Sequence, residues 1–314
     1  MRLERDIVYG QGMGEAGPVP LALDLYWSPD IGRPPRPVIL YLHGGGFQGG
    51  DKYGDYGGAS EKLMIDLASA GFAVLAANYR TTRDAPVAGA AVARLRSALA
   101  DALSAQFCSE CACAEGSERP PPRACLDGAG AYSPGPTRIG LDEYRDGMLS
   151  GRFAAAMASA VEDAAAVLNW VHAEGRARGL DAERVVLLGA SAGAVTANLL
   201  AYAADDLVEP PAPRPAGVVS ISGGLAGLER LVDADDPPAL LVHAIGDPYV
   251  GVAASDRLAA ALAGRGVTHL YARLDGAGHS LATIPVFRTR WESATLAERI
   301  RAFAEEVSQR GNAP

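Results

Sequence analysis

Residues 184–195 read RVVLLGASAGAV, an apolar run followed by a serine between two glycines. The continuous apolar run is typical of a strand buried on both faces of a sheet, and the residues after it are typical of a helix. The pattern Gly-x-Ser-x-Gly at a strand-to-helix turn predicts that Ser191 is a nucleophile. Gly189 and Gly193 fit this prediction, because side chains there would collide with the neighbouring strand and helix. The alternative is a small-residue turn that only starts a helix.

Seven other apolar runs predict further strands. They cover residues 7–9, 21–26, 38–42, 72–77, 217–221, 239–244 and 268–272. Apolar residues spaced by three or four between Phe153 and Val171 predict a helix with one buried face. Because strands and helices alternate, we expect an α/β fold with a mostly parallel eight-stranded sheet, helices on both faces and an antiparallel start. Residues 1–314 are expected to form a single domain.

The alternation is interrupted between about residues 84 and 151. This segment contains a short helical pattern near residues 92–103, all four cysteines and stretches rich in proline and glycine. Long connections within a compact domain are usually functional loops. We therefore predict an insertion over the edge of the sheet, of the kind that forms a lid, and not a second domain.

Residues 43–47 read HGGGF and follow a predicted strand. Acyl transfer builds negative charge on a carbonyl oxygen, and each backbone N–H group aimed at that oxygen stabilises it by about 3 kcal/mol. We expect the N–H groups of Gly44, Gly45 and Ala192 to form such an oxyanion hole. A glycine-rich phosphate loop is the alternative, but no Lys-Ser/Thr pair follows and the spacing fits neither nucleotide fingerprint.

Two later loops carry an acid and a histidine. Asp247 follows the predicted strand 239–244, and His279 follows the strand 268–272. The carboxyl ends of parallel strands meet at one edge of a sheet, so both side chains are expected near Ser191. The order Ser, Asp, His is that of α/β-hydrolase triads. Taken alone, Asp247 could instead cap the helix expected after it, and His279 could be a surface histidine.

The remaining histidines are weaker candidates for chemistry. His43 and Gly46 are expected to support the glycine-rich loop structurally. His243 lies in an apolar strand and is interpreted as a core histidine with satisfied hydrogen bonds. His172 falls late in a helix and His269 in a strand, and we identify no metal-ligand set among the histidines.

Taken together, these motifs resemble the carboxylesterase branch of the α/β-hydrolase superfamily, close to bacterial hormone-sensitive-lipase-like and feruloyl/acetyl esterase-like enzymes. The residues that carry the resemblance are 43–47, 189–193, 246–248 and 276–279, with Asn78-Tyr79-Arg80 and Val161-Glu162-Asp163. The resemblance covers nearly the whole chain except the insertion, which is longer than the usual connection. It implies a serine esterase that needs no cofactor. The acid loop does not settle the subgroup.

The expected reaction is cleavage of a small-molecule carboxylic ester through an acyl-enzyme formed on Ser191. In this mechanism His279 is the base, and Asp247 orients its ring. An amidase, a peptidase or a lactonase would use the same residues. A non-catalytic binding protein that works through its cysteine-containing insertion is an alternative from another class.

Composition excludes several other classes of protein. The formal net charge of −9 argues against a nucleic-acid partner, because such binding requires clustered positive charge. No stretch approaches the ~18 apolar residues of a membrane span. The first residues lack the apolar core of an export signal, which favours a cytoplasmic location. The oligomeric state cannot be read from the sequence.

The state of the cysteines is left open. Cys108, Cys111, Cys113 and Cys125 could form two disulfides in an oxidising compartment, which would imply export after removal of a signal peptide. They could also remain reduced, or bind zinc, although their spacing differs from that of familiar zinc sites.

Overall fold

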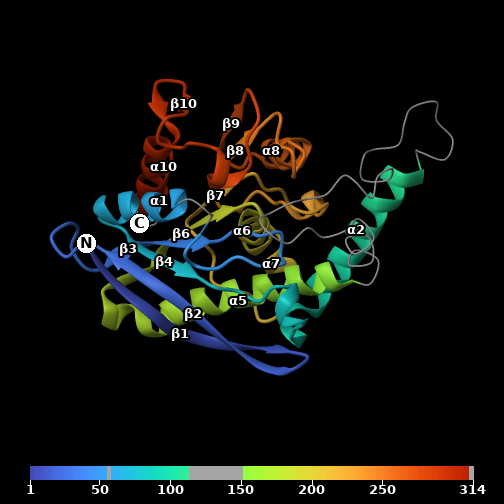
Figure 1. Cartoon of the computed structure of the whole chain (residues 1–314), viewed down its shortest axis with the longest axis horizontal. Coiled ribbons are helices and arrows are strands. Elements are labelled where there is room, and N and C mark those ends of the chain that lie inside the picture. The colour runs from blue at the N-terminus through green and yellow to red at the C-terminus, as the bar shows by residue number, and fades with distance from the viewer. Residues whose placement is uncertain (55–57, 113–150, 311–314) are drawn as a thin grey trace.

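The computed structural model describes residues 1–54, 58–112 and 151–310 (Figure 1). Nine strands form the main sheet, in the order β5-β1-β2-β4-β3-β6-β7-β8-β9. These strands are β1 (Arg2–Gly14), β2 (Gly17–Trp27), β3 (Arg36–Leu42), β4 (Ala73–Ala77), β5 (Pro86–Val87), β6 (Leu180–Ala190), β7 (Gly217–Ile221), β8 (Ala239–Ala244) and β9 (His269–Leu274). Two short strands, β10 (Arg290–Trp291) and β11 (Ala294–Thr295), form a separate antiparallel pair.

The sheet is mostly parallel, as expected. Strands β4, β3, β6, β7, β8 and β9 run parallel to one another, whereas the pairs β5-β1, β1-β2 and β2-β4 are antiparallel. All eight expected strands are present, and the two-residue β5 adds a ninth beside the far end of β1. The first two strands are longer than their apolar runs, because they pair as one long hairpin from Arg2 to Trp27.

Helices cover both faces of the sheet, and they begin and end as follows. They are α1 (Ala59–Ser69), α2 (Ala93–Ala112), α5 (Arg152–Glu174), α6 (Ala192–Tyr202), α7 (Ala204–Leu207), α8 (Ala253–Arg265), α9 (Ser280–Thr283) and α10 (Leu296–Arg310). Short 3-10 helices lie at 82–84, 90–92, 175–178 and 229–231. Residues of α1 and α10 pack on one face of the sheet and residues of α5 on the other; in Figure 1, α1 and α10 lie above β3 and β4, and α5 lies below these two strands.

Each face of the sheet has its own apolar core, because successive strand residues point to opposite faces. In β3, Val38, Leu40 and Leu42 pack with residues of α2, α5, α6 and α8, whereas Ile39 and Tyr41 pack with residues of α1 and α10. All five of these β3 side chains are buried. The central strand is thereby fixed from both sides, and so are the loops at its ends.

The structure confirms the helix predicted from the apolar spacing between Phe153 and Val171, which is α5. Its buried side chains include Phe153, Ala160, Ala164, Leu168 and Val171. A buried face of this width is sufficient to hold a long helix against a sheet.

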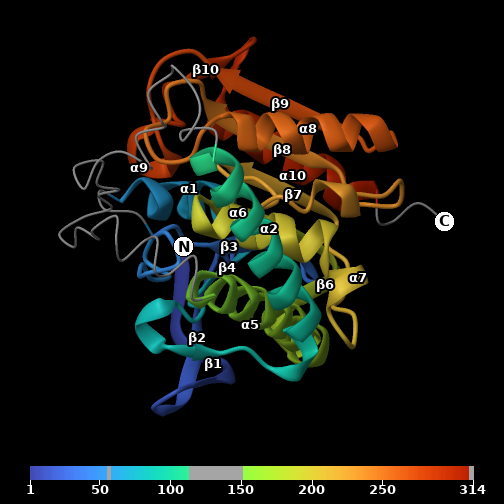
Figure 2. The same cartoon turned by 90° about the vertical axis from the view of Figure 1, so that its right-hand side faces the viewer.

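The described part of the predicted insertion is joined to the fold. The helix α2 packs against α5 (Figure 2) and buries Leu95, Leu99 and Leu103, one helical turn apart. Residues 113–150, which hold the rest of the insertion with Cys113 and Cys125, lie outside the described residues. A lid function for this segment stays a prediction.

None of the described helices has the length and hydropathy needed to cross a membrane.

Candidate active site

Ser191 lies between β6 and α6 in a strained backbone conformation, with φ 55° and ψ −118°. Its N–H donates to the carbonyl oxygen of Ile221 on the neighbouring strand, at 2.8 Å. A Cβ atom at Gly189 would overlap the backbone of Gly193, and one at Gly193 would overlap the carbonyl oxygen of Leu42. The turn is therefore packed against both neighbouring strands, and only glycine fits on either side of the serine.

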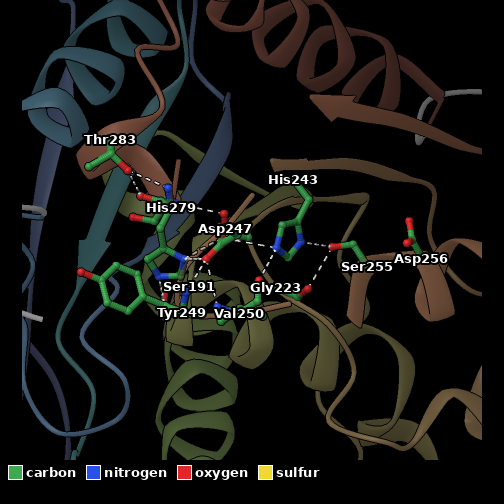
Figure 3. Close-up of polar contacts among 12 residues, drawn as sticks. Ser191, Gly223, His243, Asp247, Tyr249, Val250, Ser255, Asp256, His279 and Thr283 are labelled. Carbon is green, nitrogen blue, oxygen red and sulfur yellow. Dashed lines mark hydrogen bonds and ion pairs between the residues drawn. The ribbon is translucent and has the colours of Figure 1, made fainter. Parts of the chain in front are cut away.

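His279 lies next to the serine, in the loop that leads into α9. Its Nε2 atom is 2.8 Å from the Ser191 hydroxyl oxygen (Figure 3), and the histidine is only 8% exposed. The backbone N–H of His279 donates to the hydroxyl of Thr283 at 2.6 Å, and that hydroxyl donates to the backbone carbonyl of His279 at 3.0 Å. The ring of Tyr249 meets the imidazole edge-on, with 5.0 Å between centroids. These contacts hold the ring toward the serine.

Asp247 completes a chain of hydrogen bonds on the other side of the ring. Its Oδ2 atom accepts from Nδ1 of His279 at 2.8 Å, and its Oδ1 atom accepts from the N–H groups of Tyr249 and Val250, both at 2.9 Å. Burial alone would raise the pKa of Asp247, but hydrogen bonds from His243, His279 and the two N–H groups outweigh burial and lower the pKa well below its usual value. The carboxylate is therefore ionised at neutral pH.

The two alternative interpretations of these residues are wrong. The helix α8 starts at Ala253 with Val252 as its N-cap, so Asp247 does not cap it. His279 is a buried residue and not a surface histidine. The structure thus brings together the three side chains that the sequence placed on separate loops.

The HGGGF loop lies directly beside the serine turn. Gly193 approaches the carbonyl oxygens of Leu42 and His43 so closely that a side chain would overlap both. Gly45 has φ 128° and Gly46 has φ 61°, conformations that L side chains rarely adopt. The loop therefore follows a path that brings its backbone to the start of α6, where Ala192 lies.

His43 supports this loop and is separate from the His279 chain. Its Nδ1 atom lies 2.7 Å from the carbonyl oxygen of Gly44, and its ring stacks on Tyr79 with 4.1 Å between centroids. The Tyr79 hydroxyl donates to the His43 carbonyl at 2.6 Å. Burial lowers the pKa of His43 to about 4, so the ring is neutral and Nδ1 donates to Gly44.

A buried ion pair, which residue spacing alone did not predict, fixes the chain just after Tyr79. The Arg80 guanidinium contacts Asp163 of α5 at 2.6 Å and Glu162 at 2.7 Å. The N–H of Arg80 also donates to Asp163 at 2.8 Å. Arg80 and Asp163 belong to the tripeptides 78–80 and 161–163, which were noted for the family resemblance. That resemblance was the only signal in the sequence that could have linked the two residues.

His243 also has a place in the site that the sequence did not predict. It is fully buried with hydrogen-bond partners, as expected for a core histidine. In addition, its Nε2 atom lies 3.3 Å from Oδ2 of Asp247. Their spacing of four residues did not predict this contact, because His243 lies in a strand and Asp247 lies in the loop that follows the strand.

Metal ligands are not concentrated at this site. Within the ranges 1–54, 58–112 and 151–310, one group of three carboxylates could hold an ion: Asp205, Asp233 and Asp236. Arg214 already pairs with Asp205 at 2.7 Å. Cys108 and Cys111 lie in α2, and Cys113 and Cys125 lie outside the described residues, so the zinc, disulfide and thiol alternatives all stay open.

Two family models match the chain. A model described as alpha/beta hydrolase fold matches residues 154–313, which is just over half of the 314 residues. A second model, BD-FAE, matches residues 23–100. No curated protein matches the chain.

Solved structures of similar fold cover almost the whole chain. The thermophilic esterase Est2 of Thermogutta terrifontis is 16% identical with a TM-score of 0.57, over 97% of this chain and 90% of that chain. A truncated carbohydrate esterase from gut microbiota is 13% identical with a TM-score of 0.60, over 98% and 97%. An acetyl ester-xyloside bifunctional hydrolase from Caldicellulosiruptor lactoaceticus is 17% identical with a TM-score of 0.57, over 93% and 90%. At these identities the likeness concerns the fold.

Proposed function

Because this chain belongs to the alpha/beta hydrolase fold family, we propose that it is a serine hydrolase that cleaves small-molecule carboxylic esters. The observation that carries the proposal is the continuous hydrogen-bond chain from the Ser191 hydroxyl through His279 to Asp247, with distances of 2.8 Å on both sides of the imidazole. A nucleophile, a base and an orienting acid in this geometry form the constellation used for acyl transfer. The reaction needs no cofactor.

In the proposed mechanism, the Ser191 oxygen attacks the ester carbonyl carbon while Nε2 of His279 takes the hydroxyl proton. Asp247 keeps the proton on Nδ1 and stabilises the imidazolium that forms. The oxyanion of the tetrahedral intermediate accepts hydrogen bonds from the N–H groups of Gly44, Gly45 and Ala192. His279 then gives its proton to the leaving alcohol, and water hydrolyses the acyl-enzyme by the same steps.

An ester substrate class is supported by the neighbours of similar fold. Est2 of Thermogutta terrifontis is described as an esterase, and one of its structures is phosphorylated by paraoxon. An organophosphate of this type reacts with an activated serine. We propose the same chemistry for Ser191.

The test combines labelling with turnover. Purified protein is treated with paraoxon and digested, and the modified peptide is identified by mass spectrometry. We expect one phosphorylated residue, Ser191, and parallel loss of hydrolysis of p-nitrophenyl acetate. The Ser191→Ala variant should lose about a million-fold in kcat if the three residues act as a unit.

A series of p-nitrophenyl esters of increasing acyl length, with a matched anilide, then tests the substrate class. Cleavage of the esters with no anilide cleavage above the Ser191→Ala background supports an esterase, and Ser191-dependent cleavage of the anilide supports an amidase. Labelling at another residue, or full turnover by Ser191→Ala, would overturn the proposed function.

A further inference from the structure

His243 lies on the far side of Asp247 from His279, so that the carboxylate sits between two imidazole rings (Figure 3). His243 lies in the strand β8, whereas His279 lies in the loop between β9 and α9. The His243 and Asp247 side chains are both fully buried. The protons on His243 therefore matter for the charge at the centre of the site.

The Nε2 atom of His243 faces only acceptors. It lies 2.9 Å from the carbonyl oxygen of Val250 and 3.3 Å from Oδ2 of Asp247. Neither an amide carbonyl nor an ionised carboxylate has a proton to donate. Nε2 therefore carries a proton and donates it.

The Nδ1 atom faces a hydroxyl whose single proton is used elsewhere. It lies 2.7 Å from the Ser255 oxygen, and that oxygen lies 2.9 Å from the carbonyl oxygen of Gly223. A hydroxyl has one proton, and the Gly223 carbonyl can only accept. If Ser255 donates to Gly223, then Nδ1 also carries a proton and donates it to Ser255.

We propose that His243 is a doubly protonated imidazolium that pairs with Asp247 and acts as a positioning residue for the triad. This inference rests on the proposed function, in which Asp247 orients His279. A buried carboxylate with a cation on one side is held in place and is partly neutralised before the reaction begins.

The neighbouring helix and strand carry further charged groups near His243. The helix α8 contributes Asp256, whose pKa is lowered chiefly by hydrogen bonding from Arg273. Arg273 and the Tyr271 hydroxyl of β9 both bind Asp256, at 3.0 and 2.9 Å. Asp256 is therefore balanced by Arg273, and Asp247 is the carboxylate that pairs with His243.

The direct test is the protonation of the His243 ring in the full chain labelled with 15N-histidine. We expect both ring nitrogens to show one-bond coupling to hydrogen at the pH of full activity. The signals are assigned by their absence in His243→Gln. A single protonated nitrogen would overturn the proposal.

The variant Ser255→Ala keeps the imidazole and gives a test with opposite signs. If Nδ1 donates to Ser255, removing this acceptor lowers the fraction of doubly protonated His243 at a given pH. If Ser255 instead donates to a bare Nδ1, removing it raises that fraction. A rise would therefore overturn the proposal, and this variant also covers the case in which His243→Gln fails to fold.

A pH–rate profile tests the role in the reaction. His243→Gln should lower kcat about tenfold with little change in KM, and should move the acid limb of the profile to higher pH by about half a unit or more. The physical reason is that an unbalanced Asp247 charge makes His279 hold its proton more tightly. A loss of rate without this movement would indicate a structural role only and would overturn the charged state.

The matched control is His269→Gln, the same chemical change at a histidine in β9 whose Nδ1 atom contacts the Val267 carbonyl. Its kcat and acid limb should match those of the unmodified protein. The labelling test of Ser191 reports on the proposed function separately. The NMR arm needs no turnover, so failure of either idea can be told from failure of the other.

Discussion

At the scale of single residues, the strained backbone at Ser191 depends on what surrounds it. A conformation with φ 55° and ψ −118° costs of the order of 1–3 kcal/mol and persists only where the neighbours enforce it. Here the enforcing contacts are the hydrogen bond from Ser191 to Ile221 and the tight approach of Gly193 to Leu42. These contacts fix the backbone of Ser191, and they leave no room for a side chain at Gly193.

The variant Gly193→Ala should therefore lose activity by at least a hundredfold and lower the melting temperature. Its Cβ atom would overlap the carbonyl oxygens of Leu42 and His43, so the start of α6 must move away from the HGGGF loop. Kinetics on p-nitrophenyl acetate and thermal unfolding measure the two effects.

The control is Gly264→Ala in α8, where an added Cβ would meet nothing within 4 Å. This substitution should stabilise the helix by about 0.5–1 kcal/mol and leave activity unchanged. Equal behaviour of the two variants would contradict the steric account of the serine turn.

Asp247→Asn should lower kcat by about ten-thousand-fold, because an amide can donate to Nδ1 and hold the ring in the wrong tautomer. The amide keeps the shape of the carboxylate, and its oxygen can still accept from the N–H groups of Tyr249 and Val250. Near-normal turnover, measured with the same ester, would show that the acid is elsewhere. Far-ultraviolet circular dichroism checks that the fold is retained.

At the scale of elements, the turn that precedes β8 carries a buried carboxyl with an unusual titration. Burial, together with the nearby charges of Asp233 and Asp205, raises the pKa of Asp236 to about 6, despite a hydrogen bond from the N–H of Asp233. The folded protein thus binds this proton more tightly than the unfolded chain, where a carboxyl titrates near 3.9. The resulting stabilisation is complete below about pH 4 and is lost as the pH rises through about 6.

Asp236→Asn should remove this dependence, because an amide resembles the protonated acid. Relative to the unmodified protein, the variant should gain stability between pH 4 and pH 7 and reach an advantage of about 1–2 kcal/mol at neutral pH. Urea unfolding at pH 4.5, 6 and 7.5 measures the gain. Asp235→Asn, at an exposed neighbour, should show no such trend. A stability advantage of Asp236→Asn that grows as the pH falls would contradict the raised pKa of Asp236.

At the scale of the whole molecule, the sheet was predictable because a strand buried on both faces reads as a continuous apolar run. β3, β7 and β8 are examples. The full length of β1 was not predictable, because its outer residues alternate with charged ones and depend on pairing with β2. The two residues of β5 carry no pattern of their own.

The site likewise contains some contacts that could be predicted from the sequence and others that could not. Ser191, Asp247 and His279 each follow a strand at the same edge of the sheet, so their convergence follows from topology. The contact of Arg80 with Asp163 depends on packing between elements, and the contact of His243 with Asp247 depends on how the loop after β8 folds back. Packing of this kind leaves no periodic signal in a sequence.

The described residues contain both apolar cores and the whole Ser191–His279–Asp247 chain. Because the three side chains of this chain lie outside residues 114–149, we expect ester cleavage to survive replacement of that segment. A chain in which about 15 Gly/Ser residues replace them should unfold cooperatively and keep Ser191-dependent hydrolysis of short esters, because closing a loop with a Gly/Ser linker of this length has only a small entropic cost. If the segment covers the substrate, as the prediction of a lid implies, preference along the p-nitrophenyl acyl series should change while cleavage of the acetate does not. A replacement chain that fails to fold would instead make the segment part of the core.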